Sequence, residues 1–227
     1  MLGTRSIAIA LLSLAALAAC DDDSTGTGGT ATVRIANATS NPIDVASGTA
    51  IATGNANIGF GASSGCVTTN VFEPDVNVSP TGTTNTFASF TPNLRGGQTY
   101  VIVEYPSFAG APEFAYITTA TPPPTGQGGL RVFNAAAGSA TYDVYVTAPG
   151  AALGTAAAFG IGFRTVSGLI PVTPGTPLLI RLTNTGTQTV AINAGNQTFT
   201  AGQNAVLVIA PPAAGSTVPR TFLVNAC

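Results

Sequence analysis

The sequence contains no histidine, no lysine and no tryptophan, and charged residues make up only 7% of it. Ordinary soluble domains contain about 25% charged residues. Without histidine the chain cannot build a Ser-His-Asp or Cys-His catalytic group, and it has no imidazole to hold a metal ion. The seven basic residues are all arginines, too few for the basic patch that nucleic-acid binding requires. We therefore expect no cofactor, no metal site and no nucleic-acid partner.

A pair of carboxylates, as in glycosidases, is the remaining route to catalysis. The acids after residue 30 are Asp44, Glu73, Asp75, Glu104, Glu113 and Asp143. Only Glu73 and Asp75 are close in sequence, and Pro74 between them indicates a turn. We therefore expect that the protein is not an enzyme, and an unrecognised hydrolase is the remote alternative.

The N-terminal residues form a pattern with a specific meaning. Arg5 precedes an apolar run from Ile7 to Leu17, which is followed by small residues and then Cys20. The run is shorter than the roughly 20 apolar residues that span a bilayer, and the pattern is typical of a signal peptide. Its Leu-Ala-Ala-Cys ending resembles the lipobox of bacterial lipoproteins. An ordinary secretory signal with a chance cysteine is the alternative.

The lipobox resemblance implies that residues 1–19 are removed and that Cys20 carries lipid on its thiol and its amine. Two or three acyl chains anchor a protein far more firmly than one. Residues 20–30 continue with acidic and then Gly/Thr-rich sequence, so we expect a flexible tether. The expected partner is thus a membrane, reached through the lipid. The expected location is the cell envelope, at the outer membrane or cell surface rather than the inner membrane.

The rest of the chain contains an internal duplication, which indicates two similar units. The segment VRIANA at residues 33–38 matches LRVFNA at residues 130–135, and later matches follow in the same order. Residues 120–128 between the copies are rich in proline and glycine, which is typical of a semi-rigid linker. We therefore expect one domain at residues 31–119 and another at residues 129–227.

Apolar residues alternate with polar ones in short segments, and Gly, Pro, Asn and Ser clusters separate these segments. This period of two indicates β-strands, and no segment after residue 20 has the pattern of an amphipathic helix. Short strands at regular spacing with turn signals are typical of a β-sandwich of about seven strands. The expected fold class is all-β, with two tandem antiparallel β-sandwich domains after the signal peptide and tether.

Each unit opens with R-[IV]-x-N-A and continues to D-V, beginning at Arg34 in the first copy and at Arg131 in the second. This pattern is similar to domain-of-unknown-function family 4397. The first copy has Ala46 after D-V, where the second keeps the usual tyrosine, Tyr145. The resemblance covers nearly all of the chain after the signal peptide. It implies immunoglobulin-like or transthyretin-like sandwiches of a bacterial surface protein, and it implies no activity.

Polar residues recur at matched positions of the two copies. Arg34 with Asp44, and Arg131 with Asp143, could form ligand sites, but we expect them to be structural pairs across neighbouring antiparallel strands. Asn37 and Asn134 follow the arginines at strand ends, where asparagine side chains bond to turn backbone.

Two cysteines remain once Cys20 carries lipid. In an oxidising compartment the even count predicts a disulfide between Cys66 and Cys227, which would join the two domains. Two separate buried thiols are the alternative, because Cys66 aligns with the apolar Leu169 of the second copy.

The expected function is that of a lipid-anchored, non-catalytic module that binds an unknown glycan or envelope protein. A passive structural protein of the envelope, without a specific ligand, is the alternative. Aromatic residues in loops would favour binding, and core packing is their alternative role. The candidates are Phe72, Tyr105, Phe108 and Phe114.

Overall fold

The computed structural model describes residues 29–227 except 49, 53, 73–75, 84, 87, 90–93 and 109–110. Within these ranges the protein is all-β, with sixteen strands and no helix, which confirms the predicted fold class. No described segment is a helix with the length and hydropathy needed to cross a membrane. The expected signal peptide at residues 1–19, the expected lipid site Cys20 and most of the expected tether lie outside the described residues. The tether prediction extended too far, because Thr30 already belongs to a strand.

The first half of the chain forms two four-stranded sheets. Its strands are β1 (Thr30–Asn37), β2 (Ile43–Ser47), β3 (Ala50–Ile51), β4 (Val67–Asn70), β5 (Val76–Pro80), β6 (Ala88–Ser89), β7 (Thr99–Pro106) and β8 (Pro112–Thr118). The strand orders are β4-β1-β7-β8 in one sheet and β3-β2-β5-β6 in the other. The two sheets face each other across an apolar interior and form a sandwich.

The second half repeats this arrangement strand for strand. Its strands are β9 (Gly128–Asn134), β10 (Tyr142–Thr147), β11 (Ala158–Ile161), β12 (Ile170–Val172), β13 (Pro177–Asn184), β14 (Val190–Thr198), β15 (Asn204–Ala210) and β16 (Arg220–Asn225). The orders β12-β9-β15-β16 and β11-β10-β13-β14 are those of the first half shifted by eight strands. Each half thus has eight described strands, where about seven were expected.

Each sandwich contains one parallel strand pair, so the prediction of purely antiparallel sheets is wrong. β1 runs parallel to β7, with Thr32 opposite Thr99, and β9 runs parallel to β15, with Gly129 opposite Asn204. Between the two parallel strands the chain crosses to the opposite sheet and returns, which is the long connection that parallel pairing needs. Alternation of apolar residues does not reveal strand direction, so the sequence could not predict this feature.

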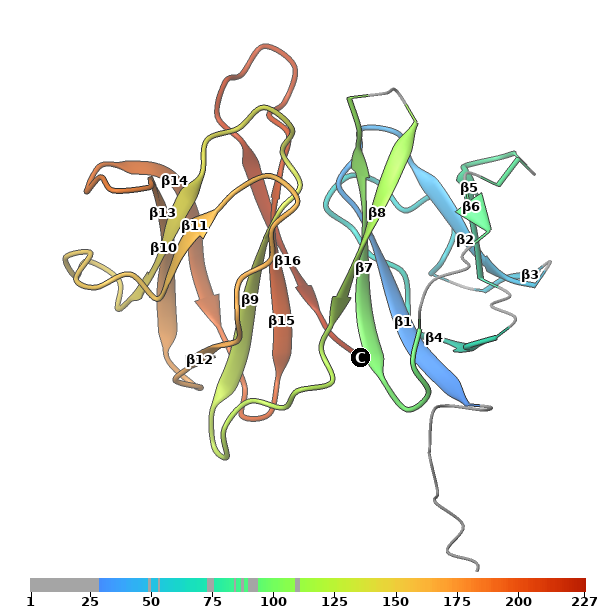
Figure 1. Ribbon diagram of the computed structural model, residues 1–227, viewed down its shortest axis with the longest axis horizontal. Coiled ribbons are helices and arrows are strands. Elements are labelled where there is room, and N and C mark those ends of the chain that lie inside the picture. The colour runs from blue at the N-terminus through green and yellow to red at the C-terminus, as the bar shows by residue number, and fades with distance from the viewer. Residues whose placement is uncertain are drawn as a thin grey trace, which may run out of the picture.

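The four sheets are stacked as four layers, with the two sheets that contain β1 and β9 in the middle (Figure 1). Three apolar clusters lie between successive layers. The first half encloses a cluster around Ile35 and Ile102, and the second encloses one around Leu130 and Leu207. The third cluster lies between the halves, where residues of β7 and β8 pack against residues of β9, β15 and β16.

The strand β7 is buried on both faces, which explains its nearly continuous apolar sequence. Tyr100 and Ile102 face the interior of the first sandwich, whereas Val101 and Val103 face the second half of the chain. The strand β15 is built in the same way. These central strands of the inner sheets therefore have no solvated face, and the two sandwiches share a core.

Candidate functional site

The surface at which the two sandwiches meet, here called the seam, is lined by aromatic rings from both halves. The ring of Tyr105 packs edge-to-face on those of Phe133 and Phe163, with centroids 5.7 and 5.9 Å apart. Phe60 packs in the same way on Phe222 at 5.6 Å. Such pairs contribute about 0.5–1.5 kcal/mol each beyond the burial of their area. The seam is thus a packed core.

Charged residues at equivalent places complete the seam. Glu113 and Arg220 occupy matching positions, opposite the strand ends at Tyr105 and Ala210. Glu113 forms an ion pair with Arg164 of the other half. The guanidinium carbon of Arg220 lies 3.3 Å from the centre of the Phe60 ring, also across the seam. Charged side chains of both halves therefore reach across the seam.

Arg164 adopts a backbone conformation that side chains rarely take. Its φ is 64°, and the matching residue of the first half is Gly61, with a φ of 75°. Both residues donate their backbone N–H to the carbonyl oxygen of a strand-end asparagine, Asn37 or Asn134. Glycine adopts this left-handed region without steric cost, whereas arginine does not. The second half therefore places a strained residue where its side chain meets Glu113.

The two halves are also joined covalently, because the structure contains a disulfide between Cys66 and Cys227. Their Cα atoms are 5.9 Å apart and 161 residues separate them in sequence. This is the pair that the cysteine count proposed, and the separate-thiol alternative does not describe the structure. Arg34 lies beside the bond, donating from Nη2 to the Cys66 Sγ at 3.2 Å and from Nη1 to the Asn225 carbonyl oxygen at 3.0 Å.

The linker is held at both ends, so it does not act as a hinge. The side-chain amide of Asn204 donates to the carbonyl oxygens of Thr119 and Thr121 at 2.9 and 3.0 Å. At the other end, the backbone N–H of Gly202 donates to the Gln127 carbonyl oxygen at 2.8 Å. The linker therefore lies along the second sandwich.

The predicted pairing of Arg34 with Asp44 is wrong, because β1 and β2 belong to different sheets. The same holds for Arg131 and Asp143, which lie on β9 and β10. Arg131 instead donates to Asn204 Oδ1 at 3.3 Å. In a sandwich the chain often crosses to the facing sheet after one strand. Two strands that are consecutive in sequence therefore need not be hydrogen-bonded to each other.

The two aspartates hold turns, at corresponding places in the two halves. Asp44 accepts hydrogen bonds from the backbone N–H groups of Asn57 at 2.7 Å and Gly82 at 3.1 Å. Asp143 accepts them from Gly160 at 2.9 Å and Gly186 at 3.0 Å. These residues are therefore structural, as expected, although through other partners.

The pKa of each aspartate lies below its usual value. For Asp44 the bond from Asn57 is the largest cause of this lowering. For Asp143 the largest single effect is burial, which raises the pKa, but the bonds from Gly186 and Gly160 together with a third bond outweigh it. Because the folded-state pKa is lowered, both groups stabilise the fold above the usual aspartate pKa, and this contribution is lost as the pH falls through the lowered value.

An asparagine and a serine of each half bond to the backbone at matching positions, and the sequence predicted only the role of the asparagines. Asn37 and Asn134 are fully buried and donate to the carbonyl oxygens of Ile58 and Ile161, which confirms the expectation that they bond to backbone. The serines before Gly65 and Gly168 were missed. Ser64 and Ser167 accept the backbone N–H of Ile35 and Val132, both at 2.9 Å. The sequence feature that could have revealed this role is the Ser-Gly dipeptide, which recurs at matching positions of the two copies.

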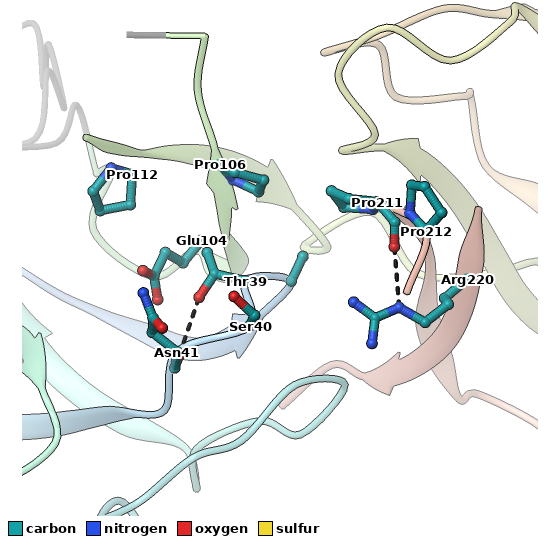
Figure 2. Close-up of a pocket in the computed structure, with 10 residues that line it drawn as sticks. Thr39, Ser40, Asn41, Glu104, Pro106, Pro112, Pro211, Pro212 and Arg220 are labelled. Atoms are coloured by element: carbon teal, nitrogen blue, oxygen red, sulfur yellow. Dashed lines mark hydrogen bonds between the residues drawn. The ribbon is translucent and has the colours of Figure 1, made fainter. Parts of the chain in front are cut away.

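A cavity of about 270 Å³ opens at one end of the seam (Figure 2). The connection between β1 and β2 forms one wall, the ends of β7 and β8 form another, and the connection between β15 and β16 closes it from the second half. The lining residues are Ala38, Thr39, Ser40, Asn41, Glu104, Pro106, Pro112, Pro211, Pro212 and Arg220. Both halves of the chain are therefore needed to build it.

Glu104 is the unusual member of this lining. Its side chain lies at the matching position of Ile209, which belongs to the apolar interior of the second sandwich. Glu104 is 1% exposed, and no described residue forms a hydrogen bond with its Oε2 atom. Burial raises the pKa of this carboxyl to about 7. The folded state thus holds the proton more tightly than the unfolded chain, so stability falls as the pH rises from about 4.5 through about 7.

A residue that lowers stability needs a reason other than folding. Glu104 is therefore the strongest candidate for a functional residue among those described. Sequence reasoning did not single it out, although a signal exists: it is the one charged residue inside the apolar run of β7.

The other candidates from the sequence do not form a common site. Glu73 and Asp75 lie outside the described residues. Phe72 and Phe108 are exposed, Tyr105 is buried in the seam, and Phe114 packs against the interior of the first sandwich. In the part of the chain that the structure describes, no three His, Cys, Asp or Glu residues are grouped as they would be around a metal ion.

Comparison with known proteins adds no relative to this picture. No family model and no curated protein matches the chain. The fold and the seam thus define a protein of two fused all-β sandwiches with a cavity between them.

Proposed function

We propose that this is a lipid-anchored protein of the cell envelope whose fused sandwiches form a non-catalytic binding module for a glycan or an envelope protein. The observation that carries the proposal is the cavity with the buried carboxyl of Glu104, whose Oε2 atom has no hydrogen-bond partner among the described residues. A structural protein without a ligand has no use for a side chain that costs stability in this way. The passive structural alternative is therefore the weaker one.

The position of the cavity supports this proposal. β1 begins at Thr30, next to the tether, and ends at Asn37, directly before the residues that line the cavity. At about 3.3 Å per residue, an eight-residue strand separates its two ends by roughly 25 Å. A ligand site at the far end of β1 would face away from a membrane that holds Cys20.

The rigidity of the seam also supports a binding role. Ligand pockets are mostly formed in advance, since ordering their walls on binding costs affinity. Here the disulfide and the shared aromatic core fix both walls before any ligand arrives. The cavity is a poor hydrolase site, because Glu104 is the only acid among the described residues that line it.

The same strand order in both halves supports a further part of the proposal. We take the two halves to be copies of one unit similar to domain-of-unknown-function family 4397. The expected domain limits at residues 31–119 and 129–227 are extended by one residue, because β1 begins at Thr30 and β9 at Gly128. The matched roles of Asp44 with Asp143 and of Asn37 with Asn134 fit an origin by duplication.

Replacing Cys20 by serine tests the lipid anchor, because serine lacks the thiol that would carry lipid. The wild-type protein should enter the detergent-rich phase in a Triton X-114 partition of whole cells. The Cys20→Ser variant should be either uncleaved at the signal peptide or recovered in the aqueous phase. The matched control is Cys66→Ser, which should still partition with the detergent. Recovery of the wild-type protein in the aqueous phase would contradict the proposal.

Ligand capture tests the binding function. The mature protein, immobilised through an added C-terminal tag, should retain a glycan from a bacterial glycan array or a protein from a solubilised envelope fraction. Filling the cavity with the Ser40→Trp substitution should reduce this capture at least tenfold, whereas Thr187→Trp on the exposed β13–β14 turn should leave it unchanged. Capture by none of the three proteins would favour the passive structural alternative, whereas equal capture by all three would show that the ligand binds outside the cavity.

A further inference from the structure

We infer that the Glu104 cavity binds a ligand through a primary ammonium group, which would sit against the Glu104 carboxylate. The inference rests on the proposed binding function and names the chemistry of its ligand. It stands on two independent observations. The cavity exists between the two halves, and the carboxyl that lines it is buried, with no described residue bonded to its Oε2 atom.

Much of the cavity lining offers no backbone hydrogen-bond donor, although Ser40, Asn41 and Arg220 carry donors on their side chains. Four of its residues are prolines, from β7, β8 and the β15–β16 connection, and proline has no backbone N–H. The Thr39 hydroxyl is already used within the protein, because its acceptors are Asn37 Oδ1 at 2.8 Å and the Asn41 carbonyl oxygen at 3.1 Å. An ionised carboxylate offers only acceptors. The group that suits this wall is therefore a strong donor that carries positive charge, which describes an ammonium ion.

Arg220 does not already fill this role. In Figure 2 it lies on the other side of the cavity from Glu104, which lies beside Thr39 and Asn41. Its Nε donates to the Pro211 carbonyl oxygen at 3.0 Å, and its guanidinium is stacked on Phe60. Burial alone accounts for the raised pKa of Glu104, with no opposing effect from Arg220. The carboxyl thus lacks a cation.

The other charged groups on neighbouring strands are engaged elsewhere. Glu113 on β8 bonds to Tyr105 and Arg164. Asp44 on β2 holds its turns, and Arg34 on β1 lies at the disulfide. None of these described groups pairs with Glu104, so below neutral pH a proton neutralises the carboxyl, and above it a cationic ligand would be the first partner of the ionised carboxylate.

The size of the cavity limits what can enter. Its volume of about 270 Å³ lies just below the roughly 300–1,000 Å³ of sites for drug-sized ligands. One amine-bearing unit fits such a space, which makes an amino sugar of a glycan and a lysine side chain of a protein the two sources. Both present the same ammonium group, and experiment can separate them.

Calorimetry with matched probes tests this inference on the full mature protein. One pair is Nα-acetyl-lysine amide and its Nε-acetylated form, and the other is methyl glucosaminide and methyl N-acetylglucosaminide. Within a pair, only the first probe carries the ammonium group. We expect at least tenfold tighter binding of that probe, in the lysine pair, the sugar pair or both, according to the natural source.

Binding of the ammonium probe should also depend on pH. The ammonium ion pairs with the ionised carboxylate, whose population falls below a pKa of about 7. For the lysine probe, whose amine stays protonated over this range, the apparent affinity should therefore weaken about tenfold from pH 8 to pH 6. Over the same range, binding should release protons, which titrations in buffers of different ionisation heat detect. The affinity of the neutral probes should not change with pH.

Two variants connect the effect to Glu104. Glu104→Gln should lose both the preference for ammonium and the pH dependence, and Glu104→Ile, which copies Ile209, should bind neither probe. Melting curves will show that both variants fold, and Glu113→Gln is the matched acid-to-amide control that keeps binding. If charged and neutral probes bind alike, if no probe binds, or if Glu104→Gln keeps the preference, the inference is wrong. Ligand capture that persists in Glu104→Gln would then show that the module binds by another surface.

Discussion

The double substitution Cys66→Ser/Cys227→Ser should lower the free energy of unfolding by about 4–5 kcal/mol. The disulfide closes a loop across a sequence separation of 161 residues. In the chain-entropy account, removing so long a closure restores many conformations to the unfolded chain and leaves the folded state little changed. Urea denaturation at neutral pH, with the midpoint and the slope measured together, will give the change.

The reduced wild-type protein is the control for this experiment. Reduction breaks the same bond without changing the side chains, so its unfolding curve should coincide with that of the double variant. The single substitution Cys66→Ser should cost a similar amount. A loss of less than 1 kcal/mol in all three proteins would show that the disulfide adds little to a seam already closed by its aromatic core.

The substitution Phe133→Ala should lower the free energy of unfolding by about 3–5 kcal/mol. Phe133 is 2% exposed, lies on β9 and packs against Tyr105 of the other half. Its loss leaves a void in the cluster that joins the two inner sheets, and this cluster cannot collapse without moving both sandwiches. The measurement is thermal and urea unfolding of the oxidised protein.

Phe108→Ala is the matched control, because Phe108 is 75% exposed although it also touches Phe163. Its truncation removes one exposed edge-to-face contact and should lower the stability by no more than about 1 kcal/mol. The shape of the transition is a second test of the seam. The wild-type protein should unfold in one cooperative step, whereas two separate steps would mean that each sandwich is stable without the other.

The sequence was sufficient to predict the all-β class, because alternation of apolar residues reports directly on burial of one face of a strand. It was also sufficient to pair Cys66 with Cys227 and to assign a backbone-bonding role to Asn37 and Asn134. These features depend on short sequence patterns or, for the disulfide, on the number of cysteines.

Features that depend on the path of the chain between sheets were not predictable in this way. The pairing of Arg34 with Asp44 failed because β1 and β2 lie in opposite sheets. The linker suggested independent domains, whereas the inner sheets share a core. The apolar runs of β7 and β15 indicated this shared core. A strand with one solvated face does not have valines such as Val101 and Val103 at the positions that alternate with Tyr100 and Ile102.

The candidate site was the least predictable part. Its lining comes from three regions that are far apart in sequence: the β1–β2 connection, the adjoining ends of β7 and β8, and the β15–β16 connection with the start of β16. The last of these belongs to the second half. Glu104 is an ordinary glutamate until the structure shows that it occupies the place of Ile209. A comparison of the two copies position by position, including β7 against β15, is the analysis that would have found it.

The parallel pairing of β1 with β7 and of β9 with β15 has a consequence for the time course of folding. β1 cannot gain this neighbour until the chain has passed through the facing sheet and returned, and folding slows as such distant contacts become more important. The hairpins β7–β8 and β15–β16 are local and can form within microseconds. The slow step in folding of each half is then the pairing of its first strand, β1 or β9, with its last hairpin. Until that step, one edge of the first strand has unpaired backbone groups that can pair with a strand of another chain.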